Sequence, residues 1–584
     1  MLKLSQMPSV SAVALAAAML AATTLAGCMT TSQTADLRPS ETVADADDDA
    51  TLYGLFLAGR TAMDLGHGQE AADYLARASN AQPDETFLKE SAFTAALVAG
   101  DVHRAATLAP RASDSTLSMQ RLGRLTQAVD HLAAGDGRQA EALLAGDPLG
   151  PPHRSAGVLL LPWAAAEAGD WKTALTLQDA RGDRLVTEVS LLNQALLFEH
   201  HHRYVEADAA FHKLMTDGDS ASLYTAAYGE FLERRGRKAE ADALYVTALK
   251  ADPTSRGVLA ARTRLASGKS PPPAPSLTQG AAQALLAPAA LFLADKQQEL
   301  GLAYLRLVLR LDPQRDEAWL LVGDSMASAG DIDAARAAYN HPQPGSADYL
   351  GARARLIETY QLPGDAPVVL KLAQETVKAA PDDPDALTLL ADALRTSEHY
   401  QESADVLDKL IAARGETASW DLYYMRGVAL EQAGHWPDAE RDLKKALVLK
   451  PDEPDILNYL GYSWIDRGQQ VAEGKAMIEK ALAAKPDSGA IIDSLGWAFY
   501  RLGDYDQSVQ QLERATELEP ADAEINNHLG DAYWRDGRRT EAGFQWRRVL
   551  TLQPDAKLRA EVEAKLKDGG PVDGQPVKSS VAAG

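Results

Sequence analysis

Three stretches near the C-terminal end share one pattern: LNYLGYSWIDRG at 457–468, IDSLGWAFYRLG at 492–503 and NNHLGDAYWRDG at 526–537. The pattern places a glycine at intervals of 34 or 35 residues, and prolines follow with the same period. The glycines are Gly427, Gly461, Gly496 and Gly530, and the prolines are Pro451, Pro486, Pro520 and Pro554. A fixed period of this length indicates a repeat architecture.

Each glycine is followed, after a turn, by small and apolar residues with the spacing of one helix face. These groups are Ala439-Leu443-Ala446, Gly474-Ile478-Ala481, Ser508-Leu512-Ala515 and Ala542-Trp546-Val549. A glycine within a helix costs about 1 kcal/mol relative to alanine, so four at one phase need a packing reason. We therefore expect the second helix of each pair to approach the first closely at the glycine. We expect the proline to end the second helix, because it lacks a backbone N–H.

This pattern resembles the tetratricopeptide-repeat (TPR) family, in which a Leu-Gly helix is followed by a second helix such as DQSVQQLERATELEP at 506–520. The resemblance implies an all-α fold: an α-solenoid, wound as a right-handed superhelix of stacked helix-turn-helix units. Single units of this kind leave one face uncovered and are stable only when stacked. The same phase occurs upstream at Gly59 to Pro83 and at Gly229 to Pro253, more weakly around Leu305, and in degenerate form between about 90 and 220.

The first residues, MLKLSQMPSVSAVALAAAMLAATTLAGC, read as a secretory signal, with one lysine before an apolar run that ends in small residues. Leu25 to Cys28 resembles the lipobox of bacterial lipoproteins. That resemblance implies cleavage after residue 27 and covalent diacylglyceryl and N-acyl lipid on Cys28. Met29 follows the cysteine where the inner-membrane retention rule favours Asp, so the expected location is the outer membrane, facing the periplasm. The alternative is a soluble secreted protein whose single cysteine stands there by chance.

These features divide the chain into six segments. They are a lipoprotein signal peptide at 1–27, a disordered acidic tether at 28–50, a partly degenerate TPR-like array at 51–267, a Pro-rich hinge or loop at 268–277, a C-terminal TPR array at 278–566, and a disordered tail at 567–584. The Pro-rich segment cannot be helical because proline runs favour extended backbone. It is either a hinge between two solenoid arms or a long loop.

Composition and motifs exclude several classes of function. A net charge of −24 argues against nucleic-acid binding, which needs clustered Lys and Arg. One cysteine permits neither an internal disulfide nor a multi-thiolate metal site. Glycine motifs at Gly66 and Gly135 follow expected helices instead of strands, so we do not interpret them as dinucleotide sites. We interpret His200-His201-His202 as a solvated turn, and predict no metal, no cofactor other than the lipid, and no catalytic site.

In the TPR family, a set of first-helix positions lines a concave groove that binds extended peptides. Transferred to this sequence, those positions predict a groove made of Asn458, Tyr462, Asp493, Trp497, Tyr500, Arg501, Asn527, Asp531, Trp534 and Arg535. Aromatic rings beside Arg and Asn offer apolar area together with donors for backbone carbonyls. The alternative is that the aromatic side chains mostly cover neighbouring helices.

The lipobox, the tether and the regular C-terminal units together resemble the outer-membrane TPR lipoproteins that act as adaptors of periplasmic carboxyl-terminal-processing proteases. The resemblance implies a non-catalytic scaffold that presents cell-wall hydrolases, or other envelope proteins, to such a protease. One alternative is a TPR lipoprotein scaffold of an exopolysaccharide-export or outer-membrane assembly machine. Another, from the enzyme class, is a helical-solenoid glycan hydrolase, to which no residue in the sequence points.

Overall fold

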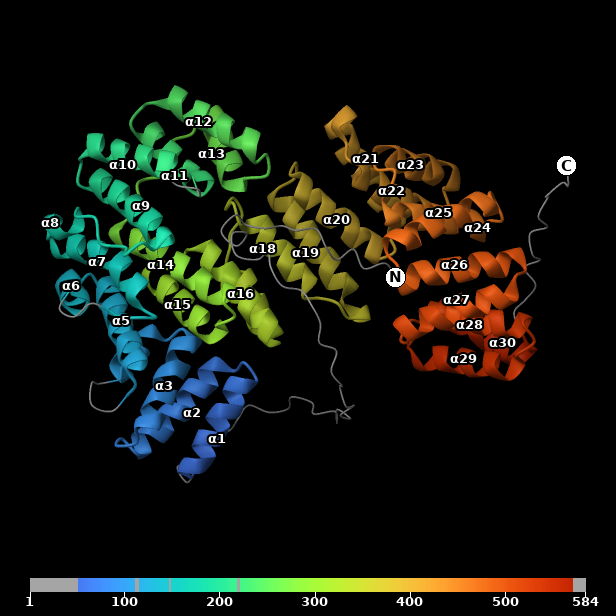
Figure 1. Ribbon diagram of the computed structural model, residues 1–584, viewed down its shortest axis with the longest axis horizontal. Coiled ribbons are helices and arrows are strands. Elements are labelled where there is room, and N and C mark those ends of the chain that lie inside the picture. Colours follow the sequence, from blue (N-terminus) through green and yellow to red (C-terminus); the bar gives the residue numbers. More distant parts are fainter. Residues whose placement is uncertain (1–50, 111–114, 146–148, 218–220, 571–584) are drawn as a thin grey trace. The chain divides into compact units, whose positions relative to one another are not determined.

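The computed structural model describes residues 51–110, 115–145, 149–217 and 221–570, which form two compact units (Figure 1). We call residues 51–361 the N-terminal unit and residues 362–570 the C-terminal unit. Every regular element within these described ranges is helical: 30 α-helices and two short 3-10 helices. The expected all-α fold is confirmed. The signal peptide, Cys28, the tether and residues 571–584 lie outside the described residues, so these predictions remain predictions.

The helices of the N-terminal unit follow one another through short turns. They are α1 (Leu52–Asp64), α2 (Gly68–Ala81), α3 (Thr86–Ala99), α4 (Val102–Leu108), α5 (Leu117–Ala133), α6 (Gly137–Ala145), α7 (Arg154–Ala168), α8 (Trp171–Ala174), α9 (Arg184–His200), α10 (Tyr204–Asp217), α11 (Ala221–Arg234), α12 (Lys238–Ala251), α13 (Arg256–Ala266), α14 (Leu277–Ala294), α15 (Gln298–Leu311), α16 (Asp316–Ala329), α17 (Ile332–Tyr339) and α18 (Tyr349–Glu358).

The C-terminal unit begins with a 3-10 turn, η1 (Pro363–Asp365), and has a second, η2 (Gly415–Thr417), after α21. Its α-helices are α19 (Ala366–Ala379), α20 (Pro384–Thr396), α21 (Tyr400–Arg414), α22 (Trp420–Gln432), α23 (Trp436–Leu449), α24 (Pro454–Asp466), α25 (Val471–Ala484), α26 (Gly489–Leu502), α27 (Tyr505–Leu518), α28 (Ala523–Arg535), α29 (Arg539–Thr551) and α30 (Ala556–Asp568).

The repeated glycines lie where two helices of a pair touch, as the period predicts. A Cβ atom on Gly496 of α26 would lie 2.6 Å from the Leu512 side chain of α27, and one on Gly530 of α28 would lie 2.5 Å from the Trp546 indole of α29. At Gly461 the nearest atom is itself backbone, the carbonyl oxygen of Gly474 at 2.7 Å. Only glycine allows these approaches, so the packing reason for the glycine phase is confirmed.

The prolines end the second helices as predicted. The helices α23, α25 and α27 stop two residues before Pro451, Pro486 and Pro520, and α29 stops three residues before Pro554. The small and apolar groups opposite the glycines are all buried, with Leu443, Ile478 and Leu512 at 0% exposure. Local sequence and packing therefore agree throughout these repeats.

The N-terminal unit departs from a simple linear stack of helices. After α13, the chain passes through the Pro-rich segment and returns, so that α14 packs on α7 and α9 while α15 packs on α3, α4 and α5 (Figure 1). Gly280 of α14 makes the closest approach, because a Cβ there would overlap the ring of Trp163, which is fully buried in α7. The helices α10–α13 thus form a side branch, which we call the spur.

Three polar contacts hold this return in place. The Tyr304 hydroxyl of α15 lies 2.8 Å from Nδ1 of the buried His153, at the start of α7 and 151 residues away in sequence. Nε of Arg306 donates to the carbonyl oxygen of Val98 at 2.9 Å, and Arg310 forms an ion pair with Asp130 at 2.8 Å. Burial lowers the pKa of the Arg306 guanidinium to about 10. A repeat period cannot predict contacts between residues so far apart in the sequence.

The boundary between the compact units differs from the predicted one. They divide at Leu362, whereas residues 268–277 lie inside the N-terminal unit. Arg234 of α11 donates to the carbonyl oxygen of Pro272 at 3.2 Å and pairs with Glu199 of α9 at 2.7 Å, so the Pro-rich segment is fixed to its own unit. The segment connects α13 to α14 within that unit.

Among the described residues, α14 alone is long and apolar enough to cross a membrane by length and composition. Half of its apolar stretch is buried inside the protein, against α7, α9 and α15. A helix that is apolar on all sides is expected in the core of a large unit, and the packing gives α14 that environment.

Candidate functional site

The candidate groove lies on the first helices of the C-terminal repeats: α22, α24, α26 and α28. Each of these helices packs through its glycine against the second helix of its pair. Among the described helices of this unit, α24 packs on α26 and α26 packs on α28, although these helices are not successive in the chain. The predicted groove residues lie in this row.

Side chains about one repeat apart connect the row from helix to helix. Nδ1 of His528 in α28 lies 2.9 Å from the Asp493 carboxylate in α26, and Arg501 in α26 donates to the carbonyl oxygen of Asp466 in α24 at 2.6 Å. Arg467 pairs with Glu431 of α22 at 2.5 Å. We call this set of contacts the inter-repeat ladder. It fixes the first helices in register.

The structure places all ten predicted groove residues in the ladder or beside it, and none of the ten is exposed. Half of them are buried: Asn458, Asp493, Tyr500, Asn527 and Asp531. The other half are partly buried: Tyr462, Trp497, Arg501, Trp534 and Arg535. The aromatic side chains therefore pack partly on neighbouring helices, as Trp497 does on His528, and their role in binding a partner stays a prediction.

The centre of the row is a stack of three rings. Trp497 lies between Tyr500 and His528, with ring centroids 4.6 Å and 4.3 Å apart. Burial alone would lower the pKa of the His528 imidazole, but the Asp493 carboxylate more than offsets burial and raises the pKa to about 9. A charged imidazolium thus lies against the Trp497 indole.

At the last repeat, α30 covers part of the predicted groove. The ammonium group of Lys565 donates to Oδ1 of Asn527 at 2.9 Å and to Oδ2 of Asp531 at 2.8 Å, and Lys565 is only 5% exposed. Asp531 also accepts from the Trp546 indole at 3.0 Å. Lys565 of the chain itself therefore occupies these two groove positions. The sequence prediction did not include this contact.

Two of the ten predicted groove residues have a buried polar atom with no hydrogen-bond partner among the described residues: Oδ1 of Asn458 in α24 and Nε1 of Trp497 in α26. An unpaired buried donor or acceptor costs about 1–3 kcal/mol. One is an acceptor and the other a donor, which are the two groups that a peptide backbone complements. Both are enclosed by neighbouring atoms, so a ligand reaches them only after a side-chain rotation.

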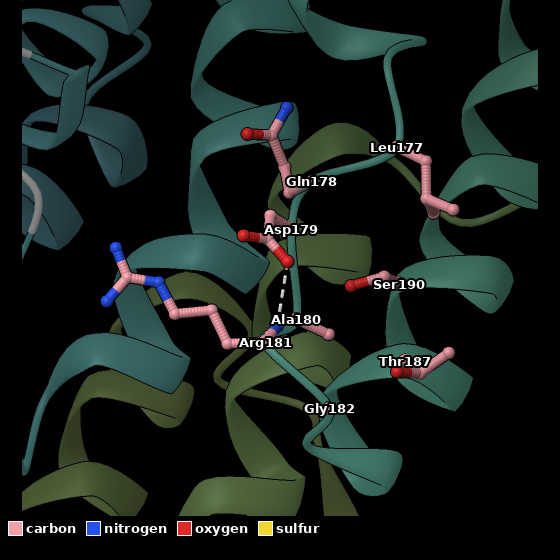
Figure 2. Close-up of a pocket in the computed structure, with 8 residues that line it drawn as sticks. All are labelled: Leu177, Gln178, Asp179, Ala180, Arg181, Gly182, Thr187 and Ser190. Carbon is pink, nitrogen blue, oxygen red and sulfur yellow. Dashed lines mark hydrogen bonds between the residues drawn. The ribbon is translucent and has the colours of Figure 1, made fainter.

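A hollow of about 240 Å³ lies in the N-terminal unit beside the short helix α8 (Figure 2). Its wall is the irregular segment 177–182, which stands where a full second helix would otherwise pack. Asp179 accepts from the backbone N–H of Arg181 at 2.8 Å, and the buried Ser190 of α9 has an unpartnered hydroxyl. The described lining residues contain no arrangement of base and nucleophile, so this hollow offers space without evident chemistry.

The histidine run ends α9 and forms the turn before α10. His201 stacks on Trp171 at 4.2 Å, and Nδ1 of His202 lies 2.8 Å from the Tyr204 hydroxyl. Within the described ranges no group of three or more His, Cys, Asp or Glu residues is placed to hold a metal ion. Gly66 and Gly135 lie in turns between helices with positive φ angles, as the repeat phase predicts.

The regular helix pairs of the C-terminal unit match a known family. Residues 370–417 and 424–489 match the family model for the tetratricopeptide repeat, and residues 496–537 match a model described as TPR repeat. These pairs are tetratricopeptide repeats. The fold class predicted from the sequence, an all-α TPR solenoid, is confirmed, and TPR arrays act as protein-binding scaffolds.

Solved structures of low identity are also similar to this chain. Residues 41 to the end of MamA from Desulfovibrio magneticus RS-1 are 20% identical, with 30% of this chain and 96% of MamA covered and a TM-score of 0.26. YrrB, described as a TPR protein with an unusual peptide-binding site, is 17% identical over 33% of this chain and 97% of YrrB, with a TM-score of 0.25.

The APC/C hetero-tetramer Cut9–Hcn1 is 14% identical over 88% of this chain and 95% of its own, with a TM-score of 0.36. No curated protein matches the chain. None of these likenesses bears on the partners of this chain.

Proposed function

We propose that this chain is a non-catalytic adaptor, held at the outer membrane by lipid on Cys28 and facing the periplasm. Its TPR array would present cell-wall hydrolases, or other envelope proteins, to a carboxyl-terminal-processing protease. The observation that supports this proposal is the inter-repeat ladder, which fixes α22, α24, α26 and α28 in register without a ligand. A surface ordered before binding loses little conformational entropy when a partner docks.

An adaptor of this kind needs no chemistry of its own. Two proteins bound to one rigid array raise each other's effective concentration to about the millimolar range when the sites are close. Several acyl chains on Cys28 would hold the array at the membrane, since each buried CH₂ contributes roughly 0.8 kcal/mol. The acidic segment that follows would give the array room to meet soluble periplasmic partners.

The decisive measurement is the rate at which the protease degrades a candidate hydrolase, with and without this chain. We expect faster turnover with the chain, and unchanged turnover would exclude the adaptor role. Arg501→Glu reverses a charge in the row of first helices and should reduce the acceleration. Arg547→Glu is the matched control, because Arg547 is exposed on the second helix α29.

The anchor and the partners need a separate test. A periplasmic pull-down with full-length chain and with Cys28→Ala, read by mass spectrometry, identifies the proteins that bind. Recovery of a protease with its hydrolases supports the adaptor. Recovery of polysaccharide-export or outer-membrane assembly components instead would favour the alternative scaffold. Loss of membrane fractionation in Cys28→Ala is expected if the cysteine carries lipid.

A further inference from the structure

Three helices of the spur are basic in a chain that is otherwise strongly acidic. Residues 221–269, which cover α11–α13 and the turn after them, contain nine Lys or Arg against five Asp or Glu, a net charge of +4, whereas the whole chain carries −24. The remaining helix of the spur, α10, has one Lys against three Asp or Glu. A local reversal of sign creates a positive potential that attracts anionic groups.

A hollow of about 260 Å³ lies at one end of the spur, between the start of α10 and the turn from α11 to α12. Two residues make it apolar: Phe231 of α11 is buried in its floor, and Val205 of α10 is 81% exposed at its edge. A valine left this open beside a concave apolar floor costs free energy that burial under a partner would recover, about 25 cal/mol per Å². The hollow has room for one apolar side chain.

Arg235 is the unpaired cation of this hollow. Its guanidinium lies 4.0 Å above the Tyr204 ring, and within the described part of the chain it pairs with no carboxylate. The neighbouring Arg237 differs, because its guanidinium is held by Asp208 and Glu240 at 2.8 Å. A guanidinium held over a ring by a cation–π contact still has N–H donors, which can bind a carboxylate bidentately.

The groups around Arg235 position its guanidinium but do not neutralise its charge. Nδ1 of His202 lies 2.8 Å from the Tyr204 hydroxyl and so fixes the ring on which Arg235 stacks. The one carboxylate that lines the hollow, Asp208, already accepts from Arg237 at 2.8 Å and from the Tyr228 hydroxyl at 2.9 Å. Asp208 is therefore already paired, and Arg235 is the cation of the hollow that no described carboxylate binds.

Two further cations extend the positive surface at this end of the spur. Lys238 begins α12 directly after the turn, and Lys269 follows α13, whose Arg264 pairs with Glu230 and Glu233 of α11. Both lysines are exposed, and neither forms an ion pair with a described residue.

We propose that this hollow docks an extended acidic segment of a partner protein. An apolar side chain of the segment would pack on Val205 and Phe231, a carboxylate next to it would bind Arg235, and further acids would lie along Lys238 and Lys269. This inference rests on the proposed scaffold role, to which it adds a second docking place outside the C-terminal repeats. It also gives the histidine run a purpose, since His202 orients the ring beneath Arg235.

The chain's own acidic run does not fit this role. Asp45, Asp47, Asp48 and Asp49 lie within six residues of Thr51, where the described residues begin, and six residues span at most roughly 20 Å. Figure 1 places α1 and the spur at opposite ends of the N-terminal unit. An anionic lipid surface fits less well, because lipid-binding patches use about 4–8 unpaired cations and no hollow.

The test uses the signal-free chain with Cys28→Ala and fluorescein-labelled decapeptide amides. We expect DELDELDELD to bind, and to bind more weakly as salt rises, whereas NQLNQLNQLN and DEGDEGDEGD should bind at least tenfold more weakly. Arg235→Gln should weaken DELDELDELD binding about tenfold and Val205→Ser about fivefold. Lys250→Gln is the matched control, since Lys250 is an equally unpaired exposed cation at the other end of α12, and it should change affinity less than twofold.

Three results would overturn the inference. They are no binding of DELDELDELD, equal binding of the amide peptide, or an equal loss in Arg235→Gln and Lys250→Gln. Arg235-dependent binding to phosphatidylglycerol vesicles without peptide binding would also overturn it, in favour of a lipid. The protease assay separates this inference from the proposed function: peptide binding without any effect of the chain on proteolysis would exclude the adaptor and leave the hollow as a docking place.

Discussion

The two units pack similar helix pairs in different ways. In the N-terminal unit α14 and α15 return to pack on helices formed long before them, whereas each helix of the C-terminal unit contacts only its close neighbours along the chain. Nearest-neighbour arrays behave as sums of repeat and interface terms. A unit closed by distant contacts should open as a whole. A destabilising substitution should therefore affect the whole N-terminal unit, but only the neighbouring repeats in the C-terminal unit.

A buried histidine and a partly buried one show the same contrast between the units in their electrostatics. His153 in the N-terminal unit faces the neutral Tyr304 hydroxyl, while His528 in the C-terminal unit faces the Asp493 carboxylate. Burial, with a smaller effect of Arg121, lowers the pKa of His153 to about 4. His528 has its pKa raised to about 9 because the carboxylate more than offsets burial. One histidine stabilises its unit when neutral, the other when charged.

The largest expected effect comes from filling the closest approach in the N-terminal unit. Gly280→Leu would force the side chain into the fully buried Trp163 and should lower the free energy of unfolding by roughly 4 kcal/mol. Hydrogen exchange should accelerate in α3, α5, α7 and α15 together. The matched control is Gly257→Leu in α13, where no atom lies within 4 Å of an added Cβ. Faster exchange confined to α14 would show that the return does not close the unit.

Alkaline pH should weaken the C-terminal unit. His528 has a folded pKa of about 9, above its ordinary 6.5, so its stabilisation is complete below about pH 6.5 and is lost as pH rises through 9. The shift corresponds to about 3 kcal/mol. Hydrogen exchange of α26 and α28, corrected for its intrinsic pH dependence, measures the loss. His528→Gln should remove the dependence, and a slope that survives in that variant would assign it to another group.

Acid pH should weaken the N-terminal unit by a similar amount. His153 has a folded pKa of about 4, below 6.5, so the native state favours the neutral ring. Its stabilisation is complete above about pH 6.5 and is lost as pH falls toward 4, for about 3 kcal/mol. Protection of α7 and α15 at pH 7 and pH 4.5 is the measurement, with His153→Gln as control. Equal acid sensitivity in α26 and α28 would contradict the contrast between the units.

The smallest effect tests how far damage travels in the C-terminal unit. Gly461→Ala would place a methyl group 2.7 Å from the carbonyl oxygen of Gly474 and should cost about 2 kcal/mol. Exchange should accelerate in α24, α25 and their direct neighbours, while α20, α21 and α29 keep their protection. Gly543→Ala is the control, because its Cβ would meet only the end of the Arg547 side chain. Uniform loss across the unit would refute one-dimensional behaviour.

The sequence reveals whatever is repeated or local. The glycine phase, the proline stops and the buried group around Leu512 recur every 34 or 35 residues, so one pattern predicts them all. The repeat period does not predict that α14 packs back on α7, because the contact between Trp163 and Gly280 is not repeated along the chain. Its one visible sign is that α14 is apolar on nearly every side, which indicates a helix covered from several directions.

The predicted groove shows a second limit of prediction from the sequence. Family positions correctly place Asn527 and Asp531 on the first helix of the last repeat, but they cannot show that Lys565 fills that place. Nor does the sequence distinguish a side chain that faces solvent from one paired a repeat away, as His528 is with Asp493. The hollow at Arg235 combines residues from two turns, and no single motif contains it.

The return of α14 has a consequence for the order of events during synthesis and export. His153 leaves the ribosome 151 residues before Tyr304, its partner, and at about 5–20 residues per second this interval lasts roughly 8–30 s. Throughout it, α7 can pack on α5, α6, α8 and α9 but lacks the cover that α14 gives to Trp163. The N-terminal unit is therefore a natural client for holding chaperones, while the C-terminal repeats can assemble one pair at a time as they emerge.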